Sequence, residues 1–393
     1  MRGNSQSNRP LRIAVLAHGQ RVAGGLWAGQ SLLAAIGRVA PQHEYLVTIT
    51  AGLGFEEVCA QIPRCETVAF DLRGGLVNRW WLETFVLRKV ITPFRPDVLV
   101  ALANRGLRRP PCPQVLTVWD AHYFYPRRHY GRIPFRFALK WRYNLWHMRR
   151  VLRHTRMLWS QTPVANRRLL QAFSFAGPTA IMSNAVSRLT IDGNSDQSMP
   201  EALAPYADRM KLFCLTRYYA HKNLESIVTM LRRFPDELAD VVVITTVAAD
   251  QYPTAGRFLR SIKHPDVRGR IVNVGPLPQS ALAGYYRHCQ AMFLPTLLES
   301  FTITYLEAMH FGVPILTSDL DFARHVCGRA ALYFDPWDVN SIKNAILRLR
   351  GDSSFRRELV ARGCERLRTE FKSWDEIAAD AIRCVESLCT GPC

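Results

Sequence analysis

Two glutamates, Glu299 and Glu307, stand seven residues apart in the stretch 291–318. The pattern places Glu299 in a loop after a buried strand and Glu307 inside a helix predicted over 302–311. In a parallel α/β sheet, such a loop and the first turn of the next helix line the ligand crevice. The free N–H groups of that turn favour an anion such as a diphosphate. A carboxylate about one turn into the helix reaches past a diphosphate to a sugar hydroxyl.

Three local signals fix this arrangement of elements. The apolar run 291–295 predicts a short buried strand, and a second strand is predicted from Val313. Gly312 stands where a glycine ends a helix, and Pro314 prevents the helix from continuing.

Each glutamate also has a plainer interpretation. Thr304 and Glu307 fit a capping box, in which the glutamate only accepts a hydrogen bond from a backbone N–H. Glu299 fits a solvated loop carboxylate equally well. The residues alone leave both alternatives open.

A second polar cluster follows the strand predicted over 211–215. Arg217 and Lys222 flank one loop at the end of this strand. A planar guanidinium and a compact ammonium together suit a diphosphate. In isolation, two surface cations would be the default interpretation of this pair.

The whole stretch 291–318 resembles the Glu-x7-Glu signature of family-4 retaining glycosyltransferases of the GT-B fold, of the type found in bacterial surface-polysaccharide and glycolipid assembly. The resemblance extends to residues 306–309 and to Gly312-x-Pro314. The spacing of Arg217 and Lys222 resembles the phosphate-binding element of the same family.

The resemblance implies an α/β GT-B architecture, with two Rossmann-like doubly wound domains facing across a cleft and the nucleotide sugar held mainly by the second. It implies that Glu307 binds ribose hydroxyls, that Arg217 and Lys222 bind the diphosphate, and that Glu299 contacts the donor sugar. The implied main-chain contacts to the phosphates come from Ser300, Phe301, Thr302 and Ile303.

Four positions depart from the family pattern. Ser300 and Thr302 stand where the family often has glycine, so the backbone approaches the donor less closely. His325 stands where many members carry glutamate, and Arg329 where an acid is common.

The first half of the chain alternates buried strands with helices, which indicates a parallel, doubly wound sheet. After the strand predicted over 12–18, Gly24 and Gly25 are expected immediately before a helix over 26–38, where the backbone is able to approach the donor. A Gly-Gly pair is as often an ordinary turn.

Asp120 and His122 follow the strand predicted over 115–119. Groups at the carboxyl end of such a strand face the ligand, so both are predicted to be catalytic. The usual His-Asp pair of the family is not reproduced, because Trp119 precedes Asp120. An ordinary loop histidine is the alternative for His122.

The charge is concentrated in the first half. The formal net charge is +19, and residues 1–187 carry +18 of it. Residues 127–158 interleave large aromatic side chains with Arg and Lys and contain no acid. This composition suits the headgroup zone of an anionic membrane. It also suits single-stranded nucleic acid or a core helix whose Arg stems cover its flanks.

Other features bound the class of protein. No apolar run approaches the length of a transmembrane helix, and the polar start of the chain predicts no signal peptide. The ten cysteines form no Cys-x-x-Cys pair, which favours reduced thiols in the cytoplasm. Asp319-x-Asp321 is interpreted as a loop and helix cap, so neither a metal nor a cofactor is predicted.

The predicted domains are residues 1–187, a linker over 188–207, residues 208–371, and a terminal helix over 372–393 that crosses back to the first domain. The predicted activity is retaining, metal-independent transfer of a hexose-type sugar from a GDP- or UDP-sugar. The predicted acceptor is a glycan or lipid-linked hydroxyl at the inner face of the membrane, where the enzyme is peripheral. A soluble sugar acceptor is one alternative, and nucleic-acid binding through the basic domain is another.

Overall fold

The computed structural model describes residues 9–72, 78, 80–102, 104–131, 135–187, 190 and 198–390. The chain divides into two compact units. The first unit comprises Met1–Asp120, Leu139–Asn184 and Lys372–Cys393, and the second comprises Ala121–Ala138 and Ala185–Phe371.

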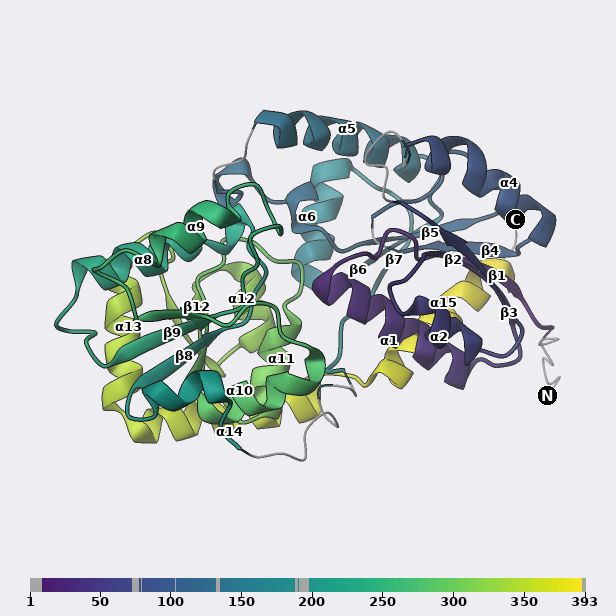
Figure 1. The fold of residues 1–393 in the computed structure, drawn as a ribbon. Coiled ribbons are helices and arrows are strands. Elements are labelled where there is room, and N and C mark those ends of the chain that lie inside the picture. Colours follow the sequence, from purple (N-terminus) through teal and green to yellow (C-terminus); the bar gives the residue numbers. More distant parts are fainter. Residues whose placement is uncertain are drawn as a thin grey trace. The chain divides into compact units, whose positions relative to one another are not determined.

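The first unit is built on a seven-stranded sheet in the order β3-β2-β1-β4-β5-β6-β7, in which all paired strands are parallel. The strands are β1 Arg12–Leu16, β2 Glu44–Thr50, β3 Cys65–Phe70, β4 Val98–Ala101, β5 Gln114–Val118, β6 Met157–Ser160 and β7 Thr179–Ile181. Strands β1, β4 and β5 are buried almost throughout, because helices cover the sheet (Figure 1).

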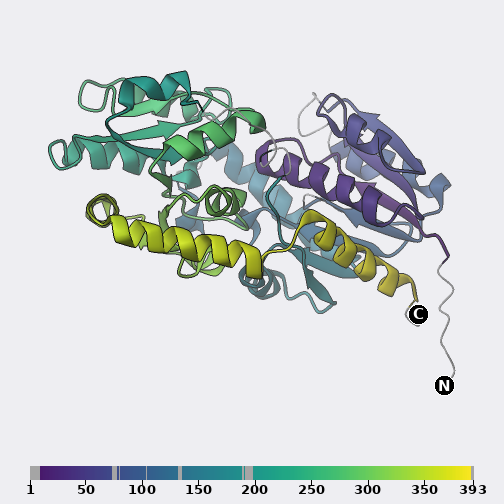
Figure 2. The ribbon, with the colours of Figure 1, turned by 90° about the horizontal axis from the view of Figure 1, so that it is seen from below.

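The helices of the first unit are α1 Ala23–Val39, α2 Phe55–Ala60, a π-helical turn Leu82–Val86 continued by α4 Leu87–Ile91, α5 Phe135–Leu152, α6 Pro163–Phe173 and α15 Trp374–Thr390. Helix α15 packs along α1, as Figure 2 shows, and buries Ile377, Ala381 and Val385. The C-terminal helix thereby completes the core of the first unit.

The second unit has a six-stranded parallel sheet in the order β10-β9-β8-β11-β12-β13. Its strands are β8 Met210–Cys214, β9 Val241–Thr245, β10 Ile271–Asn273, β11 Ala291–Leu294, β12 Ile315–Ser318 and β13 Ala331–Phe334. Its helices are α8 Leu224–Arg233, α9 Ala255–Ser261, α10 Leu282–His288, α11 Ile303–His310, α12 Asp321–Cys327, α13 Val339–Gly351 and α14 Ser353–Glu370.

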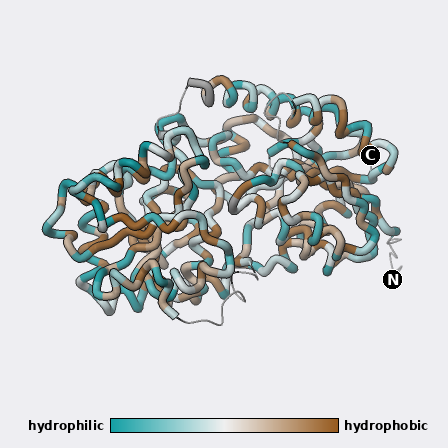
Figure 3. Tube along the Cα trace, viewed as in Figure 1, coloured by the Kyte–Doolittle hydropathy of each residue, from teal (hydrophilic) through white to brown (hydrophobic). Residues whose placement is uncertain are grey.

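The distribution of hydrophobic residues explains why the strands of both sheets are buried beneath helices. The strands are the most hydrophobic segments, and hydrophilic residues gather on the outer faces of the helices (Figure 3). Strand β9 is fully buried from Val241 to Thr245. Near-continuous apolar strands are typical of parallel sheets covered on both faces, so the predicted α/β class with two Rossmann-like units is confirmed.

The division differs from the predicted domains. Residues 185–187 group with the second unit and not with the first. Residues 121–138 were also expected in the first domain, but they group with the second unit. Two hydrogen bonds give the reason: Tyr125 OH donates to Asp321 Oδ1 at 2.6 Å, and His129 Nδ1 lies 2.8 Å from the main-chain oxygen of Leu297. Much of the predicted linker 188–207 lies outside the described residues, and Glu201–Tyr206 forms a 3₁₀ helix.

Candidate active site

The loops after β8 and β11 bring the predicted cation and carboxylate together. These strands are neighbours in the sheet, although many residues separate them in sequence. The chain order reverses direction between them, and such a switch point is where α/β sheets bind ligands. The side chains of Lys222 and Glu299 form an ion pair there, and both are largely buried. Thr296 Oγ1 also donates to Glu299 Oε1 at 2.9 Å.

This contact excludes the interpretation of Glu299 as a solvated loop carboxylate. Lys222 ends a short 3₁₀ turn, Ala220–Lys222. The main-chain oxygen of His221 in that turn accepts a hydrogen bond from the N–H of Leu297 at 2.8 Å. The two loops are therefore joined by backbone as well as side chains, which holds the ion pair in place.

Arg217 lies in the same loop as Lys222 and is half-buried. Its Nε is buried and has no hydrogen-bond partner within the described part of the chain. A buried polar group without a partner is costly unless a ligand satisfies it. Arg217 thus has the unsatisfied donor that a diphosphate site requires.

Helix α11 begins at Ile303, directly after the loop that holds Glu299. Its N-cap, Thr302, has an extended backbone and makes no side-chain capping bond. The Oγ1 atoms of Thr302 and Thr304 are buried without partners in the described residues. The first N–H groups of a helix have no partner within the helix, so the turn formed by Phe301, Thr302 and Ile303 offers main-chain donors. Ser300, just before it, is buried.

Glu307 is only 2% exposed. Tyr286 OH donates to its Oε2 at 2.9 Å, and Thr190 Oγ1 donates to its Oε1 at 3.5 Å. Burial raises the pKa of Glu307 to about 7, while the hydrogen bonds from Tyr286 and Thr190 lower it. The capping-box interpretation is wrong, because Glu307 accepts from these two hydroxyls and Thr304 Oγ1 makes no capping bond.

Residues 121–131 pack over the same loops within the second unit. The ring of His122 lies edge-on to His221, with centroids 4.7 Å apart, and His221 stacks on Tyr219 at 5.5 Å. Burial, followed by the nearby His122 and Lys222, lowers the pKa of His221 well below its usual range. Gly131, at φ +68°, lies against the main-chain oxygen of Ala220. His122 is thus brought to the loop that carries Lys222.

The other predicted residues lie in the first unit. Asp120 is the last residue of the first segment of that unit, and its N–H donates to Asn104 Oδ1 at 3.0 Å. Gly24 and Gly25 were expected before the helix, but α1 begins at Ala23 and includes both. The extended backbone of Val22, which has no side-chain cap, starts the helix three residues earlier than glycine-based reasoning placed it.

Two of the four positions that depart from the family pattern, His325 and Arg329, have main-chain partners. The main-chain oxygen of His325 accepts from Arg366 Nη2 at 2.7 Å, and that of Arg329 accepts from Arg362 Nη1 at 3.5 Å. The carboxylate of Asp319 pairs with Arg324, at 2.6 and 2.8 Å, and Asp321 accepts from Tyr125.

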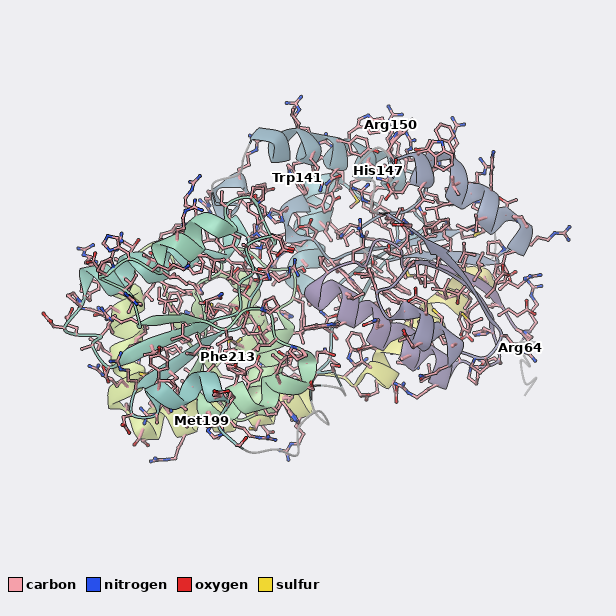
Figure 4. The ribbon with its side chains drawn as sticks, viewed as in Figure 1. Arg64, Trp141, His147, Arg150, Met199 and Phe213 are labelled. Atoms are coloured by element: carbon pink, nitrogen blue, oxygen red, sulfur yellow. The ribbon has the colours of Figure 1, made fainter. Side chains whose placement is uncertain are left out.

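The first unit contains a buried polar cluster that sequence reasoning did not single out. Glu83, on the π-helical turn, pairs with Arg105 Nη1 at 2.8 Å, and Arg105 Nη2 donates to Asn144 of α5 at 2.8 Å. His18 Nε2 lies 3.9 Å and His147 Nε2 4.0 Å from the Glu83 carboxylate. The cluster ties α5 to the sheet, and Figure 4 shows His147 beneath α5 while Arg150 points outward.

Tyr286, Thr190 and His221 were also missed. Tyr286 stands in an apolar run that predicts only a buried helix, and Thr190 lies in the segment interpreted as linker. The sequence offers one indication that His221 lies at the site, which is its position immediately before Lys222.

Known proteins share sequence and fold with this chain. Residues 195–366 match the family model described as glycosyl transferases group 1. This part of the chain is similar to the group 1 glycosyl transferases. The O-antigen chain mannosyltransferase B of Escherichia coli is 32% identical over 120 residues, which is 30% of this chain and 31% of that protein. The chain thus matches about a third of the length of this relative.

Solved glycosyltransferase structures share the fold over nearly the whole chain. Sucrose-phosphate synthase from Thermosynechococcus elongatus superposes with a TM-score of 0.73 at 17% identity, covering 96% of this chain and 99% of that one. Anabaena HepE in complex with UDP and glucose gives a TM-score of 0.68 at 16% identity, covering 96% and 100%. The fold is therefore GT-B, as predicted.

Proposed function

We propose that this group 1 glycosyltransferase moves a hexose-type sugar, with retention of anomeric configuration and without a metal, from a GDP- or UDP-sugar to a hydroxyl of a glycan or lipid-linked acceptor. The observation that carries the proposal is the Lys222–Glu299 ion pair at the switch point between β8 and β11, with the unsatisfied Nε of Arg217 in the same loop.

The two cations supply the electrostatics of the reaction. As the sugar–phosphate bond breaks, negative charge grows on the departing nucleoside diphosphate. Preorganised positive charge in a largely buried site stabilises that charge. Arg217 and Lys222 act in this role, and the amides at the start of α11 bind the phosphates. The phosphates contact main-chain N–H groups of Ser300, Phe301, Thr302 and Ile303, so this contact does not depend on the side chains of these residues.

The carboxylates orient the donor. Glu299, held by Lys222 and Thr296, hydrogen-bonds the transferred sugar. Glu307 accepts from the ribose hydroxyls. Asp120 and His122 handle the acceptor side of the reaction, and Gly24 and Gly25 border the donor. The name of the E. coli relative favours mannose among the hexoses, and the UDP complex of HepE supports a nucleoside diphosphate as the leaving group.

A thermal-unfolding panel with UDP, GDP and ADP tests the donor site. A ligand that binds only the folded state raises the unfolding midpoint with its affinity. We expect one diphosphate to raise the wild-type midpoint and to lose most of this effect in Glu307→Gln. The control is Glu237→Gln, which removes a partly exposed carboxylate paired with Lys343. If none of the three diphosphates changes the wild-type midpoint, the proposal is wrong.

We further propose that the first unit attaches to an anionic membrane surface. Five large apolar side chains are exposed on two helices, and we call them the aromatic edge: Trp80, Trp81, Phe85, Leu139 and Trp146. Trp81 is 56% and Leu139 54% exposed. No helix in the described ranges has the length and hydropathy needed to span a bilayer.

Arginines join and surround the aromatic edge. Arg108 donates to Thr84 at 2.8 Å and lies 5.6 Å from the Trp146 ring, so it bridges the helix 82–91 and α5. Arg150 lies 5.0 Å from the same ring. Aromatic rings beside cations suit the lipid headgroup zone, where a lipid-linked acceptor is presented.

Vesicle sedimentation tests this surface. We expect binding to anionic vesicles but not to zwitterionic ones. The double variant Trp81→Ala/Leu139→Ala should bind about tenfold or more weakly, because it loses two exposed apolar side chains that the proposal inserts into the headgroup zone. Trp337→Ala is the control, since Trp337 is an equally exposed tryptophan of the second unit. Equal binding by the double variant, or preference for a single-stranded oligonucleotide over vesicles, contradicts the assignment.

A further inference from the structure

Tyr286 lies on α10, inside the core of the second unit. Its side chain is fully buried, stacked on Phe311 with centroids 5.2 Å apart and edge-on to Phe213, also at 5.2 Å. Phenylalanine would satisfy this packing. The hydroxyl is nevertheless present, and it donates to Glu307 Oε2 at 2.9 Å.

The environment of Glu307 makes this hydrogen bond consequential. The carboxylate is almost completely buried, and within the described part of the chain its hydrogen-bond partners are the hydroxyls of Tyr286 and Thr190, neither of them a cation. A buried carboxylate without a cation depends on hydrogen-bond donors to remain ionised. The shorter of its two bonds comes from Tyr286.

We infer that Tyr286 is a positioning residue for donor binding, which fixes the Glu307 carboxylate through Oε2 so that the remaining acceptor sites of the carboxylate receive the ribose hydroxyls of the nucleotide sugar. This inference rests on the proposed function and deepens it. Tyr286 contacts the core and Glu307, and it acts on the ribose only through Glu307.

The number of acceptor sites on the carboxylate agrees with this role. An ionised carboxylate has about four lone-pair sites. Tyr286 takes one on Oε2, and Thr190 takes one on Oε1 at the longer distance of 3.5 Å. One acceptor site therefore remains on Oε1 and one on Oε2, which is enough for two ribose hydroxyls as long as the carboxylate stays ionised and its orientation stays fixed.

The pKa of Glu307 gives a readout that packing alone does not change. Burial raises this pKa to about 7, and the Tyr286 hydroxyl opposes the rise. Removing the hydroxyl raises the pKa further, so Glu307 becomes protonated at neutral pH. Ribose binding then weakens at pH 7 and recovers at higher pH.

The test uses Tyr286→Phe and a matched control, Tyr305→Phe. Tyr305 is also fully buried, on α11, but its hydroxyl pairs at 2.7 Å with the neutral Thr317. The dissociation constants of the diphosphate that binds wild type, chosen from UDP, GDP and ADP, and of its 2′-deoxy form are measured by calorimetry between pH 5.5 and 9.

We expect Tyr286→Phe to weaken the ribonucleotide about tenfold at pH 7, since one hydrogen bond to a charged group is lost. The 2′-deoxy form is expected to lose less than about half of that factor, because its ribose contact is already missing. The pH at which ribonucleotide affinity falls should rise by about one unit. Tyr305→Phe should change none of these.

Equal weakening of both nucleotides overturns the inference, because it indicates a packing defect, and so does an unchanged pH profile. If Tyr286→Phe does not fold, Thr190→Val is used instead, and it should raise the pH at which ribonucleotide affinity falls by a smaller amount. An unchanged pH in Thr190→Val also overturns the inference. Failure of all three diphosphates to bind wild type instead refutes the proposed function itself.

Discussion

The loop after β11 carries Glu299 and helix α11 carries Glu307, and the two carboxylates lie in different environments. Glu299 lies in the loop, ion-paired with Lys222 and supported by Thr296. Glu307 lies in the helix, buried among hydroxyl donors. The first carboxylate is paired with a cation, whereas the described partners of the second are both neutral hydroxyls.

The groups that hold each carboxylate indicate the role to which that glutamate is suited. A carboxylate held by a lysine has its geometry fixed by charge, and it suits contact with the part of the donor where charge changes. A carboxylate held by neutral donors in the core is close to protonation at neutral pH. It suits recognition of hydroxyls, and its binding strength depends on pH.

Replacing Lys222 by alanine should lower activity more than any other change proposed here. It should disturb the environment of Glu299 and not that of Glu307. It removes a phosphate-binding cation and leaves the largely buried Glu299 without its partner. We expect kcat/KM to fall roughly a hundredfold to a thousandfold, as for loss of one preorganised donor. Steady-state transfer assays measure this. Lys343→Ala, which breaks the Lys343–Glu237 pair elsewhere in the unit, should stay near wild type. A comparable loss in both variants would contradict a special role for Lys222.

Replacing Glu307 by glutamine should change the pH dependence of stability. The carboxyl loses its proton above about pH 4.5 when unfolded but keeps it to about 7 when folded. The folded state thus binds more protons in this window, so the free energy of unfolding falls as pH rises from 4.5 to 7, by roughly 3 kcal/mol at most.

Glutamine does not titrate, so this slope should disappear in the variant. Urea unfolding of ligand-free protein between pH 4.5 and 8 measures it. Glu237→Gln, which changes a partly exposed carboxylate, is the control and should keep the slope. A slope that survives in Glu307→Gln would assign the titration to another group.

Gly131→Ala should disturb the Lys222 side of the pair and leave Glu307 unchanged. A Cβ on Gly131 would lie 2.6 Å from the main-chain oxygen of Ala220, and φ is +68° there. The turn that carries Lys222 has to move, at a cost of about 1–3 kcal/mol in stability. We expect about a tenfold lower turnover with the pH profile of nucleotide affinity unaltered.

Gly269→Ala is the control for backbone strain alone, because Gly269 has φ +75° in open space. Thermal unfolding and transfer assays compare the two variants. Equal turnover in both would show that the 121–131 segment does not position the loop.

Thr296→Val should give the smallest effect. It removes the hydroxyl that donates to Glu299 at 2.9 Å while keeping the buried shape. Because Lys222 still holds the carboxylate, we expect a threefold to tenfold lower kcat/KM, the range of one neutral donor. Nucleotide affinity should not change, and a change of the same size in both quantities would argue against a contact between Glu299 and the sugar.

Local sequence patterns predicted much of the fold. The strand predicted over 211–215 is observed as β8 Met210–Cys214, and the helix predicted over 302–311 is observed as α11 Ile303–His310. Short elements with weaker patterns, namely α2, α9, α12 and β13, were not predicted. Their few residues give too little periodicity to separate them from loops.

The sequence by itself determined the α/β class, the alternation of elements and the two loops that carry Arg217, Lys222 and Glu299, because apolar runs, glycines and prolines act locally. Only the tertiary structure decided which groups meet. Strand order joins Lys222 to Glu299 across 77 positions, and helix packing joins Tyr286 to Glu307 across 21. Burial and hydrogen bonding set the ionisation of Glu307, and both arise from residues that are distant in sequence, so no local pattern contains them.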